Sequence, residues 1–180
     1  MKAIMIDIET MGTKADAAVL AIGARIFTPN GISIGFETFI SQREAERIGS
    51  VSADTMKFWS KQDPKVYELV FGGVKHPSEA ALELSNFIKV NAPETVWAKP
   101  PRFDITILEH MYAQVGLDVP WQHRAINCHR TLLSIGKLAG VKLPDISDLA
   151  AHNPLDDATA QARQAAAILK ALTVQQPKTK

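Results

Sequence analysis

The feature that most constrains the fold is the stretch of residues 3–10, which reads Ala-Ile-Met-Ile-Asp-Ile-Glu-Thr. Its alternation is typical of a buried strand, because successive side chains point to opposite faces. Asp7 and Glu9 therefore share one face, roughly 7 Å apart. Burying two unpaired carboxylates costs several kcal/mol per ion, and a divalent cation with oxygen ligands would neutralise them. The alternative is an acidic strand end that leads into a turn at Gly12.

Two further strands are expected, at about 18–27 and 32–40, joined by Thr28-Pro29-Asn30-Gly31. Asn-Gly between two β-rich runs is a strong hairpin signal. The chain then becomes helical, with short strands at 95–98 and 125–128. Helices are expected from about 52 to 59, 64 to 72, 77 to 90, 103 to 115, 131 to 139 and 154 to 174. This order predicts an α/β domain whose mixed central sheet is led by three antiparallel strands and flanked by helices.

The length of 180 residues suits one domain with a sizeable core, which we expect over 1–174, with a disordered tail at 175–180. Cys128 is the only cysteine, so a cytoplasmic setting is expected. Neither a signal peptide nor a membrane span is expected from the sequence. The net charge of +1 lacks the basic footprint of proteins that grip long duplexes. It still allows an enzyme that holds a few nucleotides through metals.

Two more carboxylates are placed to join the first pair. Asp104 follows the short strand 95–98 and a proline-broken loop, at the start of a helix. Asp157 lies in the first turn of the last helix, beside its apolar stripe, and His152 precedes that helix on a loop. Stabilisation by the helix dipole explains acidic residues in first turns equally well.

The combination of these residues favours a metal-dependent reaction at phosphorus. Four carboxylates suit two hard divalent cations, which about 3.5–4 Å apart can clamp the attacking and leaving oxygens of a phosphoryl displacement. A histidine with an ordinary pKa near 6.5 can accept a proton from the attacking water.

Three short motifs carry a family resemblance. Asp7-Ile8-Glu9-Thr10, Phe103-Asp104, and His152 with Asp157 five residues later resemble the motifs of the DEDDh 3′-5′ exonuclease superfamily, over nearly the whole chain. The likeness is greatest to small single-domain exoribonucleases of phage and bacteria. The chain departs from the pattern at 99–102, where Lys-Pro-Pro-Arg replaces small residues, and at Pro154, where alanine is common.

The resemblance implies an RNase H-like fold and 3′-5′ release of nucleoside 5′-monophosphates from single-stranded RNA or 3′ overhangs. It implies two Mg²⁺ or Mn²⁺ ions, with His152 as general base, and it allows a homodimer. The implied metal ligands are Asp7, Glu9, Asp104 and Asp157. Thr10, Met11 and Gly12 would hold the terminal nucleotide, with Met11 wedged against the last base.

Several other side chains have two interpretations. Phe58 and Phe103 are interpreted as core residues, whereas Trp59 is either core or a surface on which a base stacks. Arg130 starts a helix, where a cation is unfavourable, so it is expected to face a substrate phosphate or a carboxylate. Lys99 and Arg102 flank the second motif, where they either contact backbone phosphates or lie in a solvated loop.

Two alternatives to an exoribonuclease remain open. The same chemistry serves a DNA 3′-5′ exonuclease, since the choice of sugar depends on contacts to the 2′-hydroxyl that the sequence does not locate. The other is a catalytically silent nucleic-acid-binding domain, which is disfavoured because all four carboxylates and the histidine are present.

Overall fold

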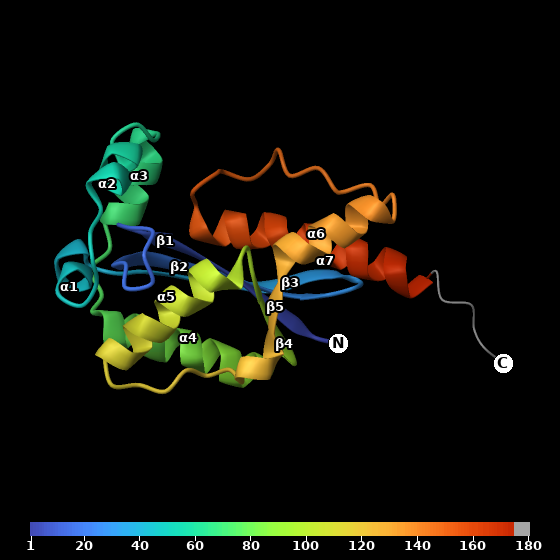
Figure 1. Cartoon of the computed structure of the whole chain (residues 1–180), viewed down its shortest axis with the longest axis horizontal. Coiled ribbons are helices and arrows are strands. Elements are labelled where there is room, and N and C mark those ends of the chain that lie inside the picture. The colour runs from blue at the N-terminus through green and yellow to red at the C-terminus, as the bar shows by residue number, and fades with distance from the viewer. Residues whose placement is uncertain (175–180) are drawn as a thin grey trace.

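A computed structural model describes residues 1–174 of the chain, and the tail expected at 175–180 lies outside them. One five-stranded sheet forms the centre, with the strand order β3-β2-β1-β4-β5 (Figure 1). The pairs β1–β2 and β2–β3 are antiparallel, whereas β4 and β5 run parallel to β1. The strands are β1 (Ala3–Thr10), β2 (Val19–Thr28), β3 (Gly31–Phe39), β4 (Thr95–Ala98) and β5 (Ile126–Cys128).

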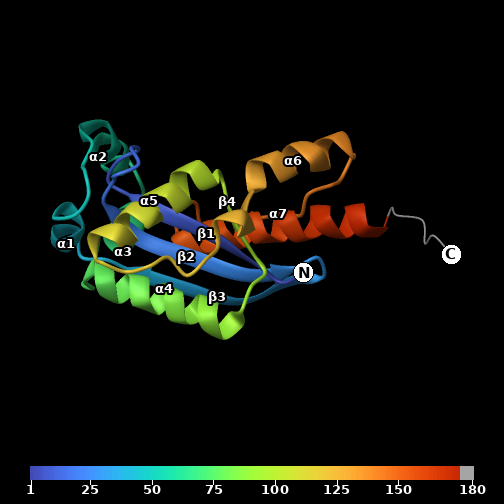
Figure 2. The same cartoon turned by 60° about the horizontal axis from the view of Figure 1, so that its bottom comes forward.

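Helices cover both faces of the sheet. Figure 2 shows α7 and α6 on one face and α4 on the other, while α1, α2 and α3 gather beyond the carboxyl end of β1 in Figure 1. The helices are α1 (Gln42–Glu46), α2 (Ala53–Trp59), α3 (Pro64–Phe71), α4 (Pro77–Asn91), α5 (Pro101–Gln114), α6 (His129–Leu138) and α7 (Pro154–Val174), with a 3-10 helix η1 (His123–Ala125) before β5. The predicted α/β class, with a mixed sheet led by three antiparallel strands, is confirmed.

The alternation along β1 divides the core into two layers. Ile4, Ile6 and Ile8 pack into the larger cluster with residues of α4 and α5. Ala3 and Met5 pack into the second cluster with residues of α6 and α7. Asp7 and Glu9 continue the second set, so the strand directs both carboxylates toward the α7 side of the sheet.

The apolar stripe expected on the last helix is its buried face. Three alanines of α7, at 158, 162 and 165, are fully buried, and α7 packs across β1, β2 and β3. Short side chains allow a helix to pack close to the sheet, so α7 can bring its polar residues, such as Asp157, near the carboxylates of β1. No helix within residues 1–174 is long and apolar enough to cross a membrane.

The structure corrects some local expectations. Helix α1 and the turn η1 were not expected, since both are too short to show a periodic pattern. The alternation of residues 32–40 predicts that Ile32, Ile34, Phe36, Thr38 and Ile40 share one face of β3, yet Ile34 is 56% exposed while Thr38 is buried. The reason is that the pairing of β2 with β3 shifts register between Arg25 and Phe27, so Ile32 packs in the cluster on the α7 side and Phe36 packs in the other cluster.

Candidate active site

The carboxylates of the first strand face the smallest residues of its neighbour. Asp7 is paired with Gly23 of β2, and Glu9 with Ala21, before the register shifts between Glu9 and Thr10. Large side chains at those two positions would fill the space above the carboxylates. The two small residues therefore keep that space open on the α7 side.

Gly23 allows the last helix to reach the site. A Cβ atom at this position would lie 2.0 Å from the carbonyl oxygen of Pro154, the first residue of α7. Real Cβ atoms do not approach backbone so closely, so any larger residue would push the start of α7 away from the sheet. Asp157 lies one turn further along the same helix.

The loop before α7 is fixed by its own hydrogen bonds. The Asn153 side chain accepts hydrogen bonds from the backbone amides of Leu155 and Asp156 at 3.0 and 3.1 Å, so it caps the start of α7. The backbone N–H of His152 donates to Oδ2 of Asp157 at 2.8 Å. His152 has a φ of 62°, a left-handed conformation that is costly for a residue with a side chain. The bond to Asp157 helps to hold this conformation.

The structure brings together the residues of the first and third motifs. One ligand atom each from Glu9, His152 and Asp157 lies within 4.8 Å of the others. Asp104 comes from the first turn of α5 and is buried, as the second motif requires. Its Oδ2 has no hydrogen-bond partner among the described residues.

Burial raises the pKa of all four carboxylates, and repulsion by the others adds to this at Asp7 and Glu9. Desolvation, followed by the charges of Asp104 and Asp157, raises the pKa of Asp7 well above its usual value. Desolvation and the other three carboxylates raise the pKa of Glu9 to about 10. Desolvation also raises the pKa of Asp104 to about 7 and, to a smaller extent, the pKa of Asp157. A group of buried anions that disfavour one another, one with an unpartnered oxygen, fits divalent cations well.

A side chain that sequence reasoning missed also contacts this group. Gln161 lies on α7 four residues after Asp157 and is only 8% exposed. Its Nε2 donates to Oδ1 of Asp7 at 2.7 Å. Spacing of four places Gln161 on the same face of the helix as Asp157, and this was the only signal in the sequence.

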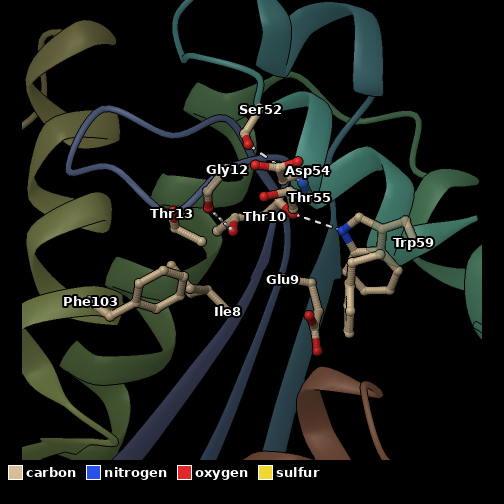
Figure 3. Close-up of a pocket in the computed structure, with 11 residues that line it drawn as sticks. Ile8, Glu9, Thr10, Gly12, Thr13, Ser52, Asp54, Thr55, Trp59 and Phe103 are labelled. Carbon is tan, nitrogen blue, oxygen red and sulfur yellow. Dashed lines mark hydrogen bonds between the residues drawn. The ribbon is translucent and has the colours of Figure 1, made fainter.

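A cavity of about 440 Å³ opens beyond Glu9, between α2 and α5. Figure 3 shows Phe103 and Ile8 on one side of this cavity and Trp59 on the other, with hydroxyl and carboxylate groups above. The polar groups of the rim come from Thr10, Thr13, Ser52, Asp54 and Thr55. An open cavity with aromatic walls and polar groups on one rim can hold a nucleoside.

The residues expected to hold the terminal nucleotide are placed differently from one another. Thr10 and Gly12 line the cavity, and the hydroxyl of Thr10 donates to the carbonyl of Gly12 at 2.7 Å. Met11, which lies between these two residues, is 1% exposed, and its side chain packs in the larger core cluster. The structure therefore does not bring Met11 to the cavity as a wedge.

The aromatic residues also differ from expectation. Phe58 was interpreted as a core residue, but it is 43% exposed and its ring meets the His152 ring edge-on at 5.1 Å between centroids. Phe103, also interpreted as core, lines the cavity. Trp59 is buried and its Nε1 donates to the carbonyl of Thr10 at 2.8 Å, so it supports the wall of the cavity. Helix α2 is short, and its position over the site could not be read from its sequence.

Arg130 and His129 begin α6 at the end of β5. Arg130 is exposed, and its charge lowers the pKa of Asp104, as expected for a cation near the site. His129 is fully buried, and its Nε2 lies 3.1 Å from Oε1 of Gln164. Burial lowers the pKa of His129 to about 4, so the ring is neutral at pH 7.

Comparison of the sequence with family models gives one match. Residues 2–169 match the family described as the 3'-5' exoribonuclease Rv2179c-like domain. No curated protein matches the sequence.

Three solved structures of similar fold are distant in sequence. The nuclease domain of 3'hExo, a DEDDh family member bound to rAMP, has a TM-score of 0.66 at 12% identity, covering 94% of this chain and 92% of that chain. Exonuclease X in complex with 5' overhanging duplex DNA has a TM-score of 0.58 at 13% identity, with 96% and 92% covered. Cell-death related nuclease 4 has a TM-score of 0.61 at 11% identity, with 96% and 64% covered. The shared feature is the RNase H-like fold, as expected from the motifs.

Proposed function

Because this chain belongs to the Rv2179c-like 3'-5' exoribonuclease domain family, we propose that it shortens RNA from the 3′ end and releases nucleoside 5′-monophosphates. The substrates would be single strands and 3′ overhangs. The observation that carries the proposal is the meeting of Glu9, Asp157 and His152 within 4.8 Å, beside a cavity of nucleoside size. The coarser activity, that of a DEDDh-type 3′-5′ exonuclease, follows from the family.

Asp7, Glu9, Asp104 and Asp157 would hold two divalent cations, Mg²⁺ or Mn²⁺. Their raised pKa values and the unpartnered Oδ2 of Asp104 support this assignment, because a bound cation would offset the repulsion among them. Such ions supply electrostatic stabilisation of the charge that develops on the phosphoryl oxygens.

His152 is proposed as the general base. The oxygen of a water molecule forms the new bond to phosphorus while the bond from phosphorus to the 3′ oxygen of the preceding nucleotide breaks. His152 accepts the proton of the water, and the leaving 3′ oxygen gains a proton to become a hydroxyl. The bond from the His152 amide to Asp157, together with the edge-on contacts to Phe58 and Trp59, restrains the imidazole next to the carboxylates.

The cavity is proposed to receive the terminal nucleoside. Phe103 and the exposed ring of Phe58 supply flat apolar walls, with Trp59 buried behind them, and stacking of a base on such walls contributes about 1–3 kcal/mol. Hydroxyl and carboxylate groups of Ser52, Asp54 and Thr55 at the rim are able to bond to sugar hydroxyls. RNA preference is proposed from the family description, and contacts at this rim would be its physical source.

A time course on matched RNA and DNA strands tests the proposal. Each strand carries a 5′ label and a 3′ overhang, and is incubated with Mg²⁺, with Mn²⁺ or with chelator. We expect a ladder that shortens from the 3′ end only when a metal is present, and faster on RNA. A faster ladder on DNA would favour the DNA exonuclease, and binding without cleavage would favour the silent domain.

Two variants show whether the carboxylates act as proposed. Asp7→Asn is expected to abolish shortening while the protein stays folded, because it removes a charge from the metal site. Asp118→Asn, in an exposed loop after α5, removes the same charge far from the site and serves as its control.

The chain needs both of its ends to build this site, since β1 and α7 each supply carboxylates. We therefore propose that residues 1–174 act as one exonuclease domain. A homodimer and a cytoplasmic location stay predictions. Sedimentation of the purified chain and fractionation of cells test them.

A further inference from the structure

Lys99 emerges beside the first strand, at the position where β4 ends. In the parallel ladder of β1 and β4, Met5 is paired with Trp97, and both side chains pack in the cluster on the α7 side. Two residues further along, the same register places Lys99 next to Asp7 on that side. In the ladder of β4 and β5, Ala98 is paired with Cys128, so Lys99 also lies next to His129.

The electrostatics of the site agree with this placement of Lys99. Its ammonium group lowers the pKa of Asp7 and of Asp157, and it also lowers the pKa of His129. Arg130 lies on the same half of the sheet, one residue beyond His129, and lowers the pKa of Asp104. Two cations therefore flank the carboxylates over β4 and β5.

Both cations are available to a ligand. Lys99 and Arg130 are exposed, and neither forms a salt bridge with any residue of the described part of the chain. The other ion pairs there show that oppositely charged neighbours do pair where geometry allows, as Lys75 does with Glu83. The carboxylates beside Lys99 and Arg130 are those assigned to metal.

The cavity and the two cations lie on different sides of the carboxylates. The cavity begins at Glu9, beyond the end of β1, and is enclosed by α2 and by Phe103. A terminal nucleoside in this cavity puts the scissile phosphate at the carboxylates. The preceding nucleotides must then leave in a direction away from the cavity. Lys99 and Arg130 line such a direction.

We propose that Lys99 and Arg130 bind the phosphate groups of the nucleotide chain on the 5′ side of the scissile bond. This inference rests on the proposed function, and it makes the substrate a strand with at least one further phosphate upstream. Lys99 is a point charge, whereas Arg130 can bond to two phosphate oxygens at once. Both contacts are independent of sequence, because phosphate carries no base information.

Binding to a fluorescent oligoribonucleotide of about ten residues tests the proposal by anisotropy in chelator, over a range of salt. Lys99→Met and Arg130→Met should each weaken binding about tenfold at low salt and reduce the slope of log affinity against log salt by about 0.7. Lys89 is exposed on α4, across the sheet from the site, so Lys89→Met removes the same charge and should change neither the affinity nor the salt slope. Wild-type affinity and slope in both site variants would overturn the proposal.

Hydrolysis assays distinguish contacts to the upstream phosphates from contacts to the scissile phosphate. On the oligoribonucleotide with Mn²⁺, both variants should raise KM about tenfold and keep kcat near that of the wild type. On the p-nitrophenyl ester of uridine 5′-monophosphate, which has no upstream phosphate, both should match the wild type. An equal loss on the ester would place the cations at the scissile phosphate and overturn the proposal. If the wild type cleaves neither compound but binding still depends on both cations, the proposed function fails, and of this inference the binding of phosphate groups by Lys99 and Arg130 stands.

Discussion

Replacing Gln161 by leucine isolates one hydrogen bond at the metal site. The bond runs from Nε2 of Gln161 to Oδ1 of Asp7 at 2.7 Å, in a buried setting. Hydrogen bonds to charged groups contribute about 1.5–3 kcal/mol. Since about 1.4 kcal/mol corresponds to a factor of ten, the loss corresponds to roughly 10- to 100-fold in divalent-metal affinity. Leucine has a similar volume, so the packing of α7 on the sheet is preserved.

Titration calorimetry with Mn²⁺ in the absence of substrate measures this effect directly. We expect weaker Mn²⁺ binding together with an unfolding temperature equal to or above that of the wild type. In the metal-free protein the substitution leaves Oδ1 of Asp7 without its donor, but Oε1 of Gln161 is itself buried without a partner, and leucine removes that cost, so the two effects on stability offset each other. A role of Gln161 in folding alone would lower the unfolding temperature instead.

Gln164→Leu provides the matched control. Gln164 lies three residues further along α7 and faces His129, not Asp7. The substitution should leave Mn²⁺ affinity unchanged. Equal affinities for the wild type, Gln161→Leu and Gln164→Leu would refute the reasoning, because other contacts would then orient Asp7. Gln161→Asn, which keeps the amide on a shorter stem, should recover part of the affinity.

Three other variants test the surroundings of the site. Gly23→Ala should lower the exonuclease rate by displacing the start of α7 at Pro154, and overpacking should lower the free energy of unfolding by about 1–3 kcal/mol in chemical denaturation. A rate equal to that of the wild type would contradict this role of Gly23. Glu9→Gln should abolish activity. It should also raise the unfolding temperature of the metal-free protein at pH 7 by at least about 2–4 °C, because the pKa of Glu9 is raised to about 10 and the folded state disfavours its charge. An unchanged or lower unfolding temperature would argue against that repulsion. His129 has a folded-state pKa of about 4, below its unfolded value near 6.5, so its contribution to stability is present above pH 6.5 and is lost as pH falls toward 4. The wild type should therefore lose up to about 3 kcal/mol relative to His129→Gln across this window in urea denaturation, and parallel pH profiles would exclude the assignment.

Patterns of short range predicted most of the fold. Alternation in β1, the Asn-Gly turn before β3 and the alanine stripe of α7 are local features that survive folding unchanged. The four carboxylates lie on the elements where the sequence placed them, in the first strand or in the first turn of a helix, and their role as metal ligands stays a proposal. The position of α2 over the site was not predictable, because it depends on contacts such as that of Trp59 with the carbonyl of Thr10.

Exposure of single side chains was the hardest property to predict. Met11 and Phe58 are both large and apolar, yet Met11 is buried and Phe58 is exposed beside His152. Nothing within either residue's own segment distinguishes them. The outcome depends on which elements pack nearby, and a cavity that accepts a flat ligand must expose an apolar wall.

Four residues that shape the site lie along one line across the sheet. Gly23, Asp7, Lys99 and His129 lie side by side on neighbouring strands or at their ends, on the side that faces α7. Gly23 admits the helix, and the helix then brings Gln161 to Asp7 at 2.7 Å. Lys99 adds a positive charge next to the same carboxylate. The register of the sheet thus determines the surroundings of Asp7, and a shift of one residue in β4 would move Lys99 to the opposite face.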